Sequence, residues 1–204
     1  TNRTPQFSWR NATDYSGLAN YTVQIDNDFG FGSFDRTFNV DNLTTWYYVL
    51  GGEQLGADAV YYWRVYYCDL LSYCNTSEIF NYTVDNTVPV VALNSPTDKS
   101  WSQSPGVTFT YTPTETNLDW CIIQSNWTDG VFKYNTSDQS PSSGAQNNLV
   151  ATNITDGYYD WNVICVDRAG NNNTLTTNRS VGIDLNNPQI NLTVSPTPIE
   201  FGLE

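Results

Sequence analysis

Several residue types that support catalysis or metal binding are missing or scarce in this 204-residue chain. It has no histidine and no methionine, and its 8 Lys and Arg face 21 Asp and Glu. Without histidine, the chain lacks the commonest general base and the commonest metal ligand of proteins. Only Lys99 and Lys133 remain as candidates for Schiff-base chemistry. We therefore expect no enzyme activity, no metal site and no cofactor.

The shortage of positive charge excludes a second group of functions. The formal net charge is −13, so nucleic-acid phosphates and anionic lipid surfaces repel the chain. No apolar run approaches the roughly 18 residues of a transmembrane helix, and we expect no membrane span. Apolar and aromatic residues are plentiful, at 39% and 15% of the chain. They suffice for the cores of one large or two small domains.

Two counts point to the outside of the cell. There are four cysteines, one pair in each half of the chain, which favours disulfides in an oxidising compartment. Composition alone would give about five N-x-Ser/Thr acceptor sites for N-linked glycans, but there are twelve, at Asn2, Asn11, Asn20, Asn42, Asn75, Asn81, Asn126, Asn135, Asn153, Asn172, Asn178 and Asn191. Turn-rich sequence around Asn126, Asn135 and Asn172 favours these sites for early modification. The alternative is that an Asn- and Thr-rich β-protein carries such triplets unmodified.

An internal repeat of about 99 residues organises the chain. YYWRVYYCD at 61–69 matches YDWNVICVD at 159–167, and VDNTVP at 84–89 matches IDLNNP at 183–188. A Ser-Pro-Thr sequence recurs at 95–97 and 195–197, and Pro105 is matched with Pro5. The repeat predicts a first domain over 1–88, a second over 89–187, and a separate C-terminal segment over 188–204.

Apolar residues alternate along both units, as in Tyr61, Trp63, Val65 and Tyr67. This is strand periodicity, and clusters of Gly, Asn, Asp, Pro and Ser separate the runs. The chain resembles fibronectin type III and immunoglobulin-like prokaryotic surface repeats, on the evidence of Trp9, the YxWxV strands and the DRAGN turn at 167–171. The resemblance implies an all-β fold of two tandem β-sandwiches and specifies no activity.

The cysteines fit this fold. Cys68 and Cys74 enclose five residues, so a bond between them would clip the last hairpin of the first unit. The resemblance implies that Cys121 and Cys165 lie on neighbouring strands of one sheet, where a cross-strand bond is plausible. A four-thiolate metal site is the alternative, but the repeat places the two pairs in different domains.

The two termini complement each other. In the second unit 16 residues precede Pro105, whereas four precede Pro5, so the first unit lacks its opening strand. The surplus segment 188–204 reads as an opening strand, with Ile190, Leu192 and Val194 on one face. We expect it to pair in the vacant slot beside Phe7 and Trp9 of another copy, as a donor strand does. This arrangement resembles the glycosylated, donor-strand-linked subunits of archaeal surface filaments called threads.

The sequence therefore favours an extracellular structural subunit of a glycosylated cell-surface filament, whose partners are copies of itself and N-linked glycans. The alternative is a window cut from a longer tandem array, such as a surface adhesin or stalk with carbohydrate-binding capacity. Its candidate sugar-stacking aromatics are Tyr47, Tyr48, Tyr66, Tyr73, Trp101 and Trp127.

Two acidic features are weaker. Asp26 and Asp28 before Gly30 form a fragment of a calcium loop, for which a solvated turn is the favoured interpretation. Paired carboxylates such as Asp156 and Asp160 are the kind of residues that hydrolyse glycosides, but no cleft is indicated around them.

Overall fold

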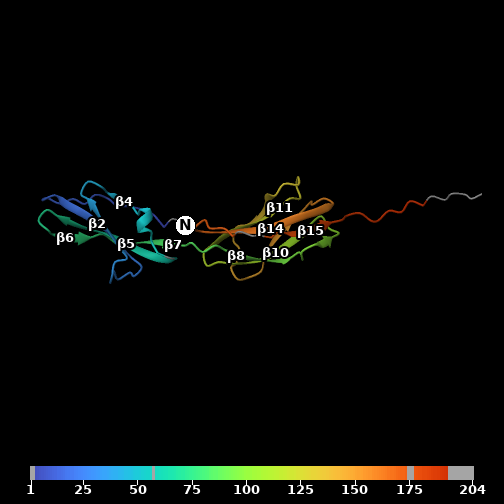
Figure 1. Cartoon of the computed structure of the whole chain (residues 1–204), viewed down its shortest axis with the longest axis horizontal. Coiled ribbons are helices and arrows are strands. Elements are labelled where there is room, and N and C mark those ends of the chain that lie inside the picture. Colours follow the sequence, from blue (N-terminus) through green and yellow to red (C-terminus); the bar gives the residue numbers. More distant parts are fainter. Residues whose placement is uncertain (1–2, 57, 174–176, 193–204) are drawn as a thin grey trace, which may run out of the picture.

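The computed structural model describes residues 3–56, 58–173 and 177–192. Two β-sandwiches follow one another along a rod, and residues 188–192 extend away from the second sandwich (Figure 1). The all-β prediction with tandem immunoglobulin-like sandwiches is confirmed. The described residues contain one short helical element, the 3-10 turn η1 (Gly51–Glu53).

The first sandwich contains seven strands in two sheets. The strands are β1 (Gln6–Ser8), β2 (Leu18–Asp26), β3 (Arg36–Asp41), β4 (Trp46–Tyr48), β5 (Ala59–Asp69), β6 (Cys74–Thr76) and β7 (Phe80–Val84). β1 pairs with β4 in a two-stranded sheet, and the other sheet has the order β3-β2-β5-β6, with β7 also paired to β5. Alternate residues of β2 and β5, among them Tyr21, Val23, Tyr61 and Val65, are buried between the sheets.

The second sandwich has eight strands and a fuller set of pairings. They are β8 (Val90–Ser95), β9 (Ser100–Ser102), β10 (Val107–Thr114), β11 (Leu118–Ser125), β12 (Lys133–Asp138), β13 (Asn147–Ala151), β14 (Gly157–Asp167) and β15 (Arg179–Ile183). One sheet has the order β13-β10-β8 and the other β12-β11-β14-β15-β9. Trp161 and Phe109, both fully buried, lie at the centre of the core with ring centroids 4.7 Å apart.

Both predicted disulfides are confirmed. Cys68 and Cys74 lie opposite each other on β5 and β6 and are bonded. Cys121 and Cys165 lie opposite each other on β11 and β14 and are bonded. In the first sandwich the positions of this second pair are held by Tyr21 and Tyr67, whose rings are 6.4 Å apart.

The strand pairing corrects one detail of the sequence repeat. Phe7 packs on Trp63 at 4.8 Å as Phe109 packs on Trp161 at 4.7 Å. The two phenylalanines are 102 residues apart, so matching Pro105 with Pro5 at a distance of 100 is wrong by two positions. Prolines start loops as readily as strands, and the shared core contact of a buried ring is the better guide to equivalence.

Candidate functional site

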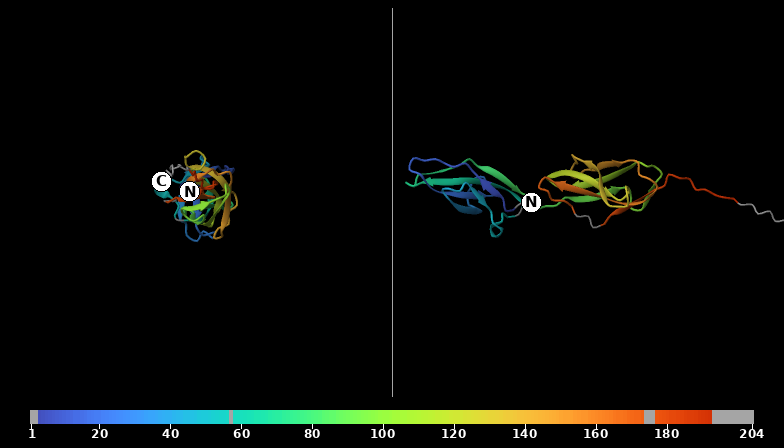
Figure 2. Two further views of the ribbon diagram at one scale, coloured as in Figure 1. Left: turned by 90° about the vertical axis from the view of Figure 1, so that its right-hand side faces the viewer. Right: turned by 90° about the horizontal axis from the view of Figure 1, so that it is seen from above.

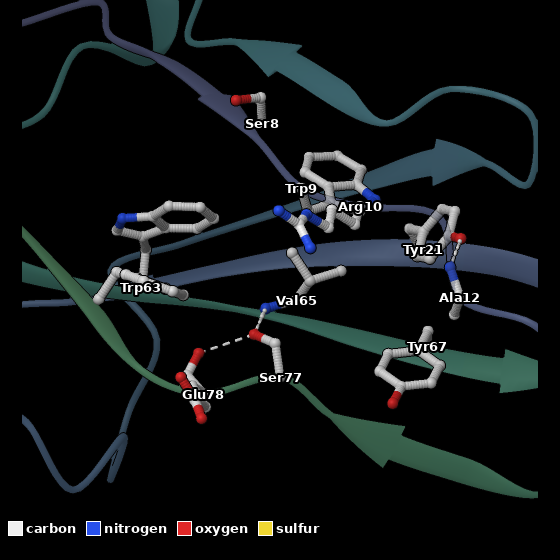
Figure 3. A pocket seen from close by; sticks show the side chains of 11 residues that line it. Ser8, Trp9, Arg10, Ala12, Tyr21, Trp63, Val65, Tyr67, Ser77 and Glu78 are labelled. Atoms are coloured by element: carbon white, nitrogen blue, oxygen red, sulfur yellow. Dashed lines mark hydrogen bonds between the residues drawn. The ribbon is translucent and has the colours of Figure 1, made fainter.

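An open groove runs along the first sandwich. It has a volume of about 600 Å³. It is lined by Ser8, Trp9, Arg10, Ala12, Tyr21, Trp63, Val65, Tyr67, Ser77, Glu78 and Phe80. Figure 3 shows side chains from β5 between the segment that follows β1 and the segment that precedes β7. The groove therefore lies between the two sheets, at the edge where β1 and β7 face each other.

The floor of the groove is apolar and its rim is polar. Trp63, Val65 and Tyr67 are alternate residues of β5 and present their side chains to the same face. Arg10 and Glu78 are exposed residues at opposite sides of the rim. A cavity with this lining accommodates an extended segment with apolar side chains on one face and polar side chains on the other.

In the second sandwich the same place is filled by strand β8. Val91 is 9% exposed and belongs to the core, and Leu93 packs against it. β8 pairs with β10, the counterpart of β1, and brings Leu93 opposite Tyr111. Strand β8 thus shows how a strand in the groove of the first sandwich would pair with β1 and cover the core.

The open groove is bordered by unused strand edges. Within the described residues, β1 pairs only with β4 and β7 pairs only with β5. In the second sandwich the equivalent edges are covered, because β8 pairs with β10 and β9 runs parallel to β15. Open edges next to an apolar groove are a template for adding a strand.

The predicted donor residues lie unpaired at the other end of the chain. Ile190 and Leu192 are 81% and 82% exposed, and Val194 lies outside the described residues. Ile190 and Leu192 lie 99 residues after Val91 and Leu93. Pro188 likewise lies 99 residues after Pro89, which precedes β8. The two tail residues are thus the repeat counterparts of the two residues that close the second core.

The predicted acceptor residues take different roles. Trp9 is half-buried and lines the groove. Phe7 is 3% exposed and is a core residue beneath it, packed on Trp63. Sequence reasoning missed Trp63, Tyr67 and Phe80, although the alternation along 61–69 already placed the first two on the inner face of their strand.

A hydrogen-bonded tyrosine fixes one side of the groove. The hydroxyl of Tyr21 donates to Asn11 Oδ1 at 2.5 Å and accepts the backbone N–H of Ala12 at 2.8 Å. The ring of Trp9 packs edge-on against Tyr21 at 5.5 Å. These contacts hold the segment after β1 in place without a neighbouring strand, so the groove has a rigid wall.

The acidic residues near Gly30 cap a turn. Asp26 Oδ1 accepts the N–H of Asp28 at 3.0 Å, Asp28 Oδ1 accepts that of Gly30 at 3.1 Å, and Asp35 Oδ2 accepts that of Asn27 at 2.9 Å. No group of three or more His, Cys, Asp or Glu side chains is placed to hold a metal ion within the described ranges. These contacts match the predicted turn, but Asp26 is 1% exposed, so its carboxylate is buried and not solvated as expected.

Asp156 and Asp160 also accept hydrogen bonds from neighbouring protein groups. Asp156 accepts the N–H of Leu185 at 2.6 Å, and Asp160 accepts the hydroxyl of Ser180 at 2.7 Å. Both carboxylates therefore hold neighbouring segments together.

The candidate sugar-stacking aromatics are dispersed. Tyr47 stacks on Phe38 at 4.4 Å, and Trp127 stacks on Phe109 at 5.4 Å against the second core. Tyr66 is half-buried on β5, and Tyr48, Tyr73 and Trp101 are exposed on different elements. No two of the six candidates are recorded as a stacked pair in the described structure.

The acceptor asparagines differ in how free their side chains are. Asn11, Asn20, Asn75, Asn81, Asn153, Asn172, Asn178 and Asn191 are exposed, whereas Asn42, Asn126 and Asn135 are half-buried and Asn2 lies outside the described residues. The Nδ2 of Asn42 donates to the carbonyl oxygen of Leu18 at 2.7 Å, and that of Asn135 donates to Ser125 Oγ at 2.6 Å. A glycan is attached through this nitrogen, so these two sites are the least accessible of those described.

No family model and no curated protein sequence matches the chain. Solved structures that resemble it include the fibronectin(III)-like modules of Clostridium thermocellum CbhA, with 15% identity, 84% of this chain and 80% of that chain covered, and a TM-score of 0.43. The FN1–FN3 domains of chicken CNTN1 show 14% identity, 90% and 62% coverage and a TM-score of 0.48. The amphioxus IgVJ-C2 molecule shows 11% identity, 88% and 94% coverage and a TM-score of 0.30. At these identities the likeness concerns the fold alone.

Within the part of the chain that the structure describes, no helix has the length and apolar character needed to cross a bilayer.

Proposed function

We propose that the protein is a structural subunit of an extracellular, glycosylated surface filament, in which the C-terminal segment of one copy fills the open groove of the next. One observation carries the proposal. A groove with two unused strand edges lies in the first sandwich, at the place where the second sandwich holds its own strand β8.

The proposed joint is formed by strand addition. Residues 189–195 pair with the free edge of β1, Leu192 lies against Trp9, and Ile190 enters the groove one step closer to the far tip. Burial of Ile190, Leu192 and Val194 contributes about 1.5 to 3 kcal/mol each, or roughly 5 to 9 kcal/mol together, before main-chain hydrogen bonds are counted. An apolar joint of that size dissociates slowly.

The geometry of donor and acceptor favours a linear polymer. The groove is in the first sandwich and the donor segment follows the second, so donor and acceptor lie on different parts of the rod (Figure 1). A contact between different surfaces of identical copies is heterologous, and it propagates when the copies are arranged end to end. The outcome is a filament one subunit thick.

Charge and glycans support a location outside the cell. A net charge of −13 makes the subunits repel one another sideways. Exposed acceptor sites occur on both sandwiches, for example Asn20, Asn81 and Asn153. Sugars at these sites would shield the rod from proteases and from lateral aggregation.

A tandem array is the alternative use of the same groove. In a longer polypeptide, a preceding domain supplies the strand, and the protein is a stalk or adhesin in place of a polymer. The intact mass of the mature protein separates the two, because an array is a multiple of the 23.0 kDa repeat pair whereas a free subunit has this mass plus sugar.

A binding experiment tests the groove directly. A full-length Leu192→Asp chain is unable to donate its own strand, and it is titrated with a labelled peptide of residues 188–204. We expect saturable binding with quenching of groove tryptophan fluorescence, and at least a tenfold weaker Kd for the same peptide carrying Leu192→Asp. Absence of binding by the native peptide would contradict the proposal.

A further inference from the structure

The segment that joins the two sandwiches is held by hydrogen bonds from both. In the first sandwich, Asp58 Oδ1 accepts the backbone N–H of Asn86 at 2.6 Å and its side-chain amide at 3.0 Å. In the second sandwich, Asn171 donates to the carbonyl oxygen of Asp85 at 2.9 Å, and Asn117 donates to the Asp85 carboxylate at 2.7 Å. Because the segment is fixed from both sides, the sandwiches meet end to end in one arrangement (Figure 2).

The segment that leaves the second sandwich is held by the same kinds of hydrogen bond as the segment that joins the two sandwiches. Asp156 Oδ1 accepts the backbone N–H of Leu185 at 2.6 Å, and its other oxygen accepts the side-chain amide of Asn186. Asp184 accepts the N–H of Asn186 at 3.1 Å. The exit of the second sandwich is therefore built like the exit of the first, where Asp58 holds the chain.

The turn that receives the joining segment also exists in both sandwiches. Asp167 Oδ1 accepts the backbone N–H groups of Ala169 and Asn171, both at 2.8 Å. Asp69 Oδ1 accepts the N–H groups of Leu71 and Tyr73, again both at 2.8 Å. The turn of the first sandwich lies at its far tip, where it receives no joining segment from the described residues.

Both free ends carry apolar side chains. The tip patch consists of Leu70, Leu71 and Tyr73, which are 65%, 68% and 76% exposed. The end patch, at the exit of the second sandwich, consists of Trp101, Tyr158 and Leu185, which are 65%, 49% and 44% exposed. The rings of Trp101 and Tyr158 lie 5.7 Å apart.

The joint within the chain is more polar at the corresponding positions. The receiving turn of the second sandwich has Arg168, Ala169 and Asn171 where the tip patch has Leu70, Leu71 and Tyr73, and the first exit has Asn86 where the second has Leu185. The first exit keeps one exposed apolar residue, Val60, 41% exposed, where the second has Tyr158. The internal joint therefore has fewer large apolar side chains than the two ends of the rod. Exposed apolar patches of this kind mark interaction surfaces.

We infer that the tip patch of one copy packs against the end patch of another copy, forming an apolar counterpart of the internal joint. This inference rests on the proposed function and adds to it a second contact, outside the groove, that fixes the angle between subunits. The partner is another copy of this two-sandwich unit, because the two patches lie at opposite ends of the rod and are unable to meet within one unit (Figure 1).

The tip patch is continuous with the open groove. Tyr67 lines the groove and also the recess that contains Tyr73 and Cys74. A segment that crosses the tip patch from an exit like that after Asp184 arrives directly at the groove. The two contacts therefore act in series, with the tip orienting the incoming sandwich and the groove holding its strand.

Cross-linking of full-length chains tests the contact. No free cysteines are present in the described residues, so Leu71→Cys and Leu185→Cys are introduced into two separate chains, which are mixed under mild oxidation. We expect a disulfide-linked dimer on a non-reducing gel. The matched control pairs Leu50→Cys with Leu185→Cys and gives no dimer, because Leu50 is 60% exposed and lies beside Pro5, at the opposite end of the first sandwich from the tip patch. Equal yields from both pairs would overturn the inference.

A second measurement separates this contact from the groove. The double variant Leu70→Ser, Leu71→Ser should bind the 188–204 peptide with unchanged Kd, because the peptide uses only the groove. Association of full-length chains should weaken about tenfold or more for each leucine that is buried, measured by sedimentation. If association equals that of the control Leu50→Ser, the tip patch is not an interface. If the native peptide fails to bind while the cross-link forms, the groove proposal fails and the end-to-end contact stands.

Discussion

Leu93 of β8 lies directly opposite Tyr111 of β10, and Tyr111 is fully buried. The counterpart of Tyr111 in the first sandwich is Trp9, which is only half-buried and lines the open groove. The repeat makes Leu192 the counterpart of Leu93. Among its described residues, the first sandwich thus has no side chain of its own against Trp9 at the position that Leu93 occupies in the second sandwich.

The first prediction concerns this missing side chain. Leu192→Asp should abolish association between chains, because it places a charge against Trp9 in an apolar groove. Asn191→Asp should have little effect, since alternate residues of a strand face opposite sides. Size-exclusion chromatography of the two full-length variants measures the difference. Equal loss of association in both would show that charge on the tail, and not burial of its apolar face, is what matters.

The second prediction concerns the disulfides. Cys121–Cys165 closes a loop with a sequence separation of 44, and Cys68–Cys74 closes one of 6. In the loop-entropy description, removing the first bond by paired Cys→Ala changes should lower the free energy of unfolding by about 4 kcal/mol, and removing the second by about 2 kcal/mol. Urea unfolding followed by tryptophan fluorescence compares the two. A larger loss for the short loop would contradict this account.

The third prediction concerns alkaline stability. Burial, followed by a hydrogen bond to Glu53 and its charge, raises the pKa of Tyr47 to about 12. Burial, followed by a hydrogen bond to Asp138 and its charge, also raises the pKa of Tyr111. Unfolded tyrosines ionise near pH 10, so the unfolded state releases protons first and the free energy of unfolding falls as pH rises above about 10.

The test of this pH dependence uses Tyr→Phe variants. Tyr47→Phe and Tyr111→Phe should each flatten the fall in the free energy of unfolding between about pH 9 and pH 11.5. Tyr15→Phe is the matched control, because Tyr15 is fully exposed and should leave the slope as in the native chain. If the free energy of unfolding falls with pH equally in all three variants, groups other than Tyr47 and Tyr111 cause the loss of stability.

The fourth prediction concerns glycans. Exposed acceptors such as Asn20, Asn81 and Asn153 should be modified more fully than Asn42 and Asn135, whose Nδ2 atoms donate hydrogen bonds to other protein groups. This differs from the expectation from turn-rich sequence, which favoured Asn135 among the first sites. Peptide mapping by mass spectrometry of native material measures occupancy. High occupancy at Asn42 and Asn135 would mean that modification precedes folding.

The sequence alone determined the local features of this protein. Alternation with a period of two identified the strands, because inward and outward faces of a sheet impose it directly on residues such as Trp63 and Val65. The repeat identified the two-sandwich fold, and the close spacing of Cys68 and Cys74 predicted their bond. The Cys121–Cys165 bond was implied by the resemblance to immunoglobulin-like repeats. The repeat also pointed to the donor segment and to Trp9.

Only the tertiary structure decided which distant segments lie side by side. The groove is formed by Trp63 of β5, Phe80 of β7 and Trp9 from the segment after β1. The turns at the two ends of the rod are held by Asp69 and Asp156. The offset of 102 between Phe7 and Phe109 likewise came from shared core packing. Such relationships depend on long-range strand pairing and side-chain packing, which local periodicity does not encode.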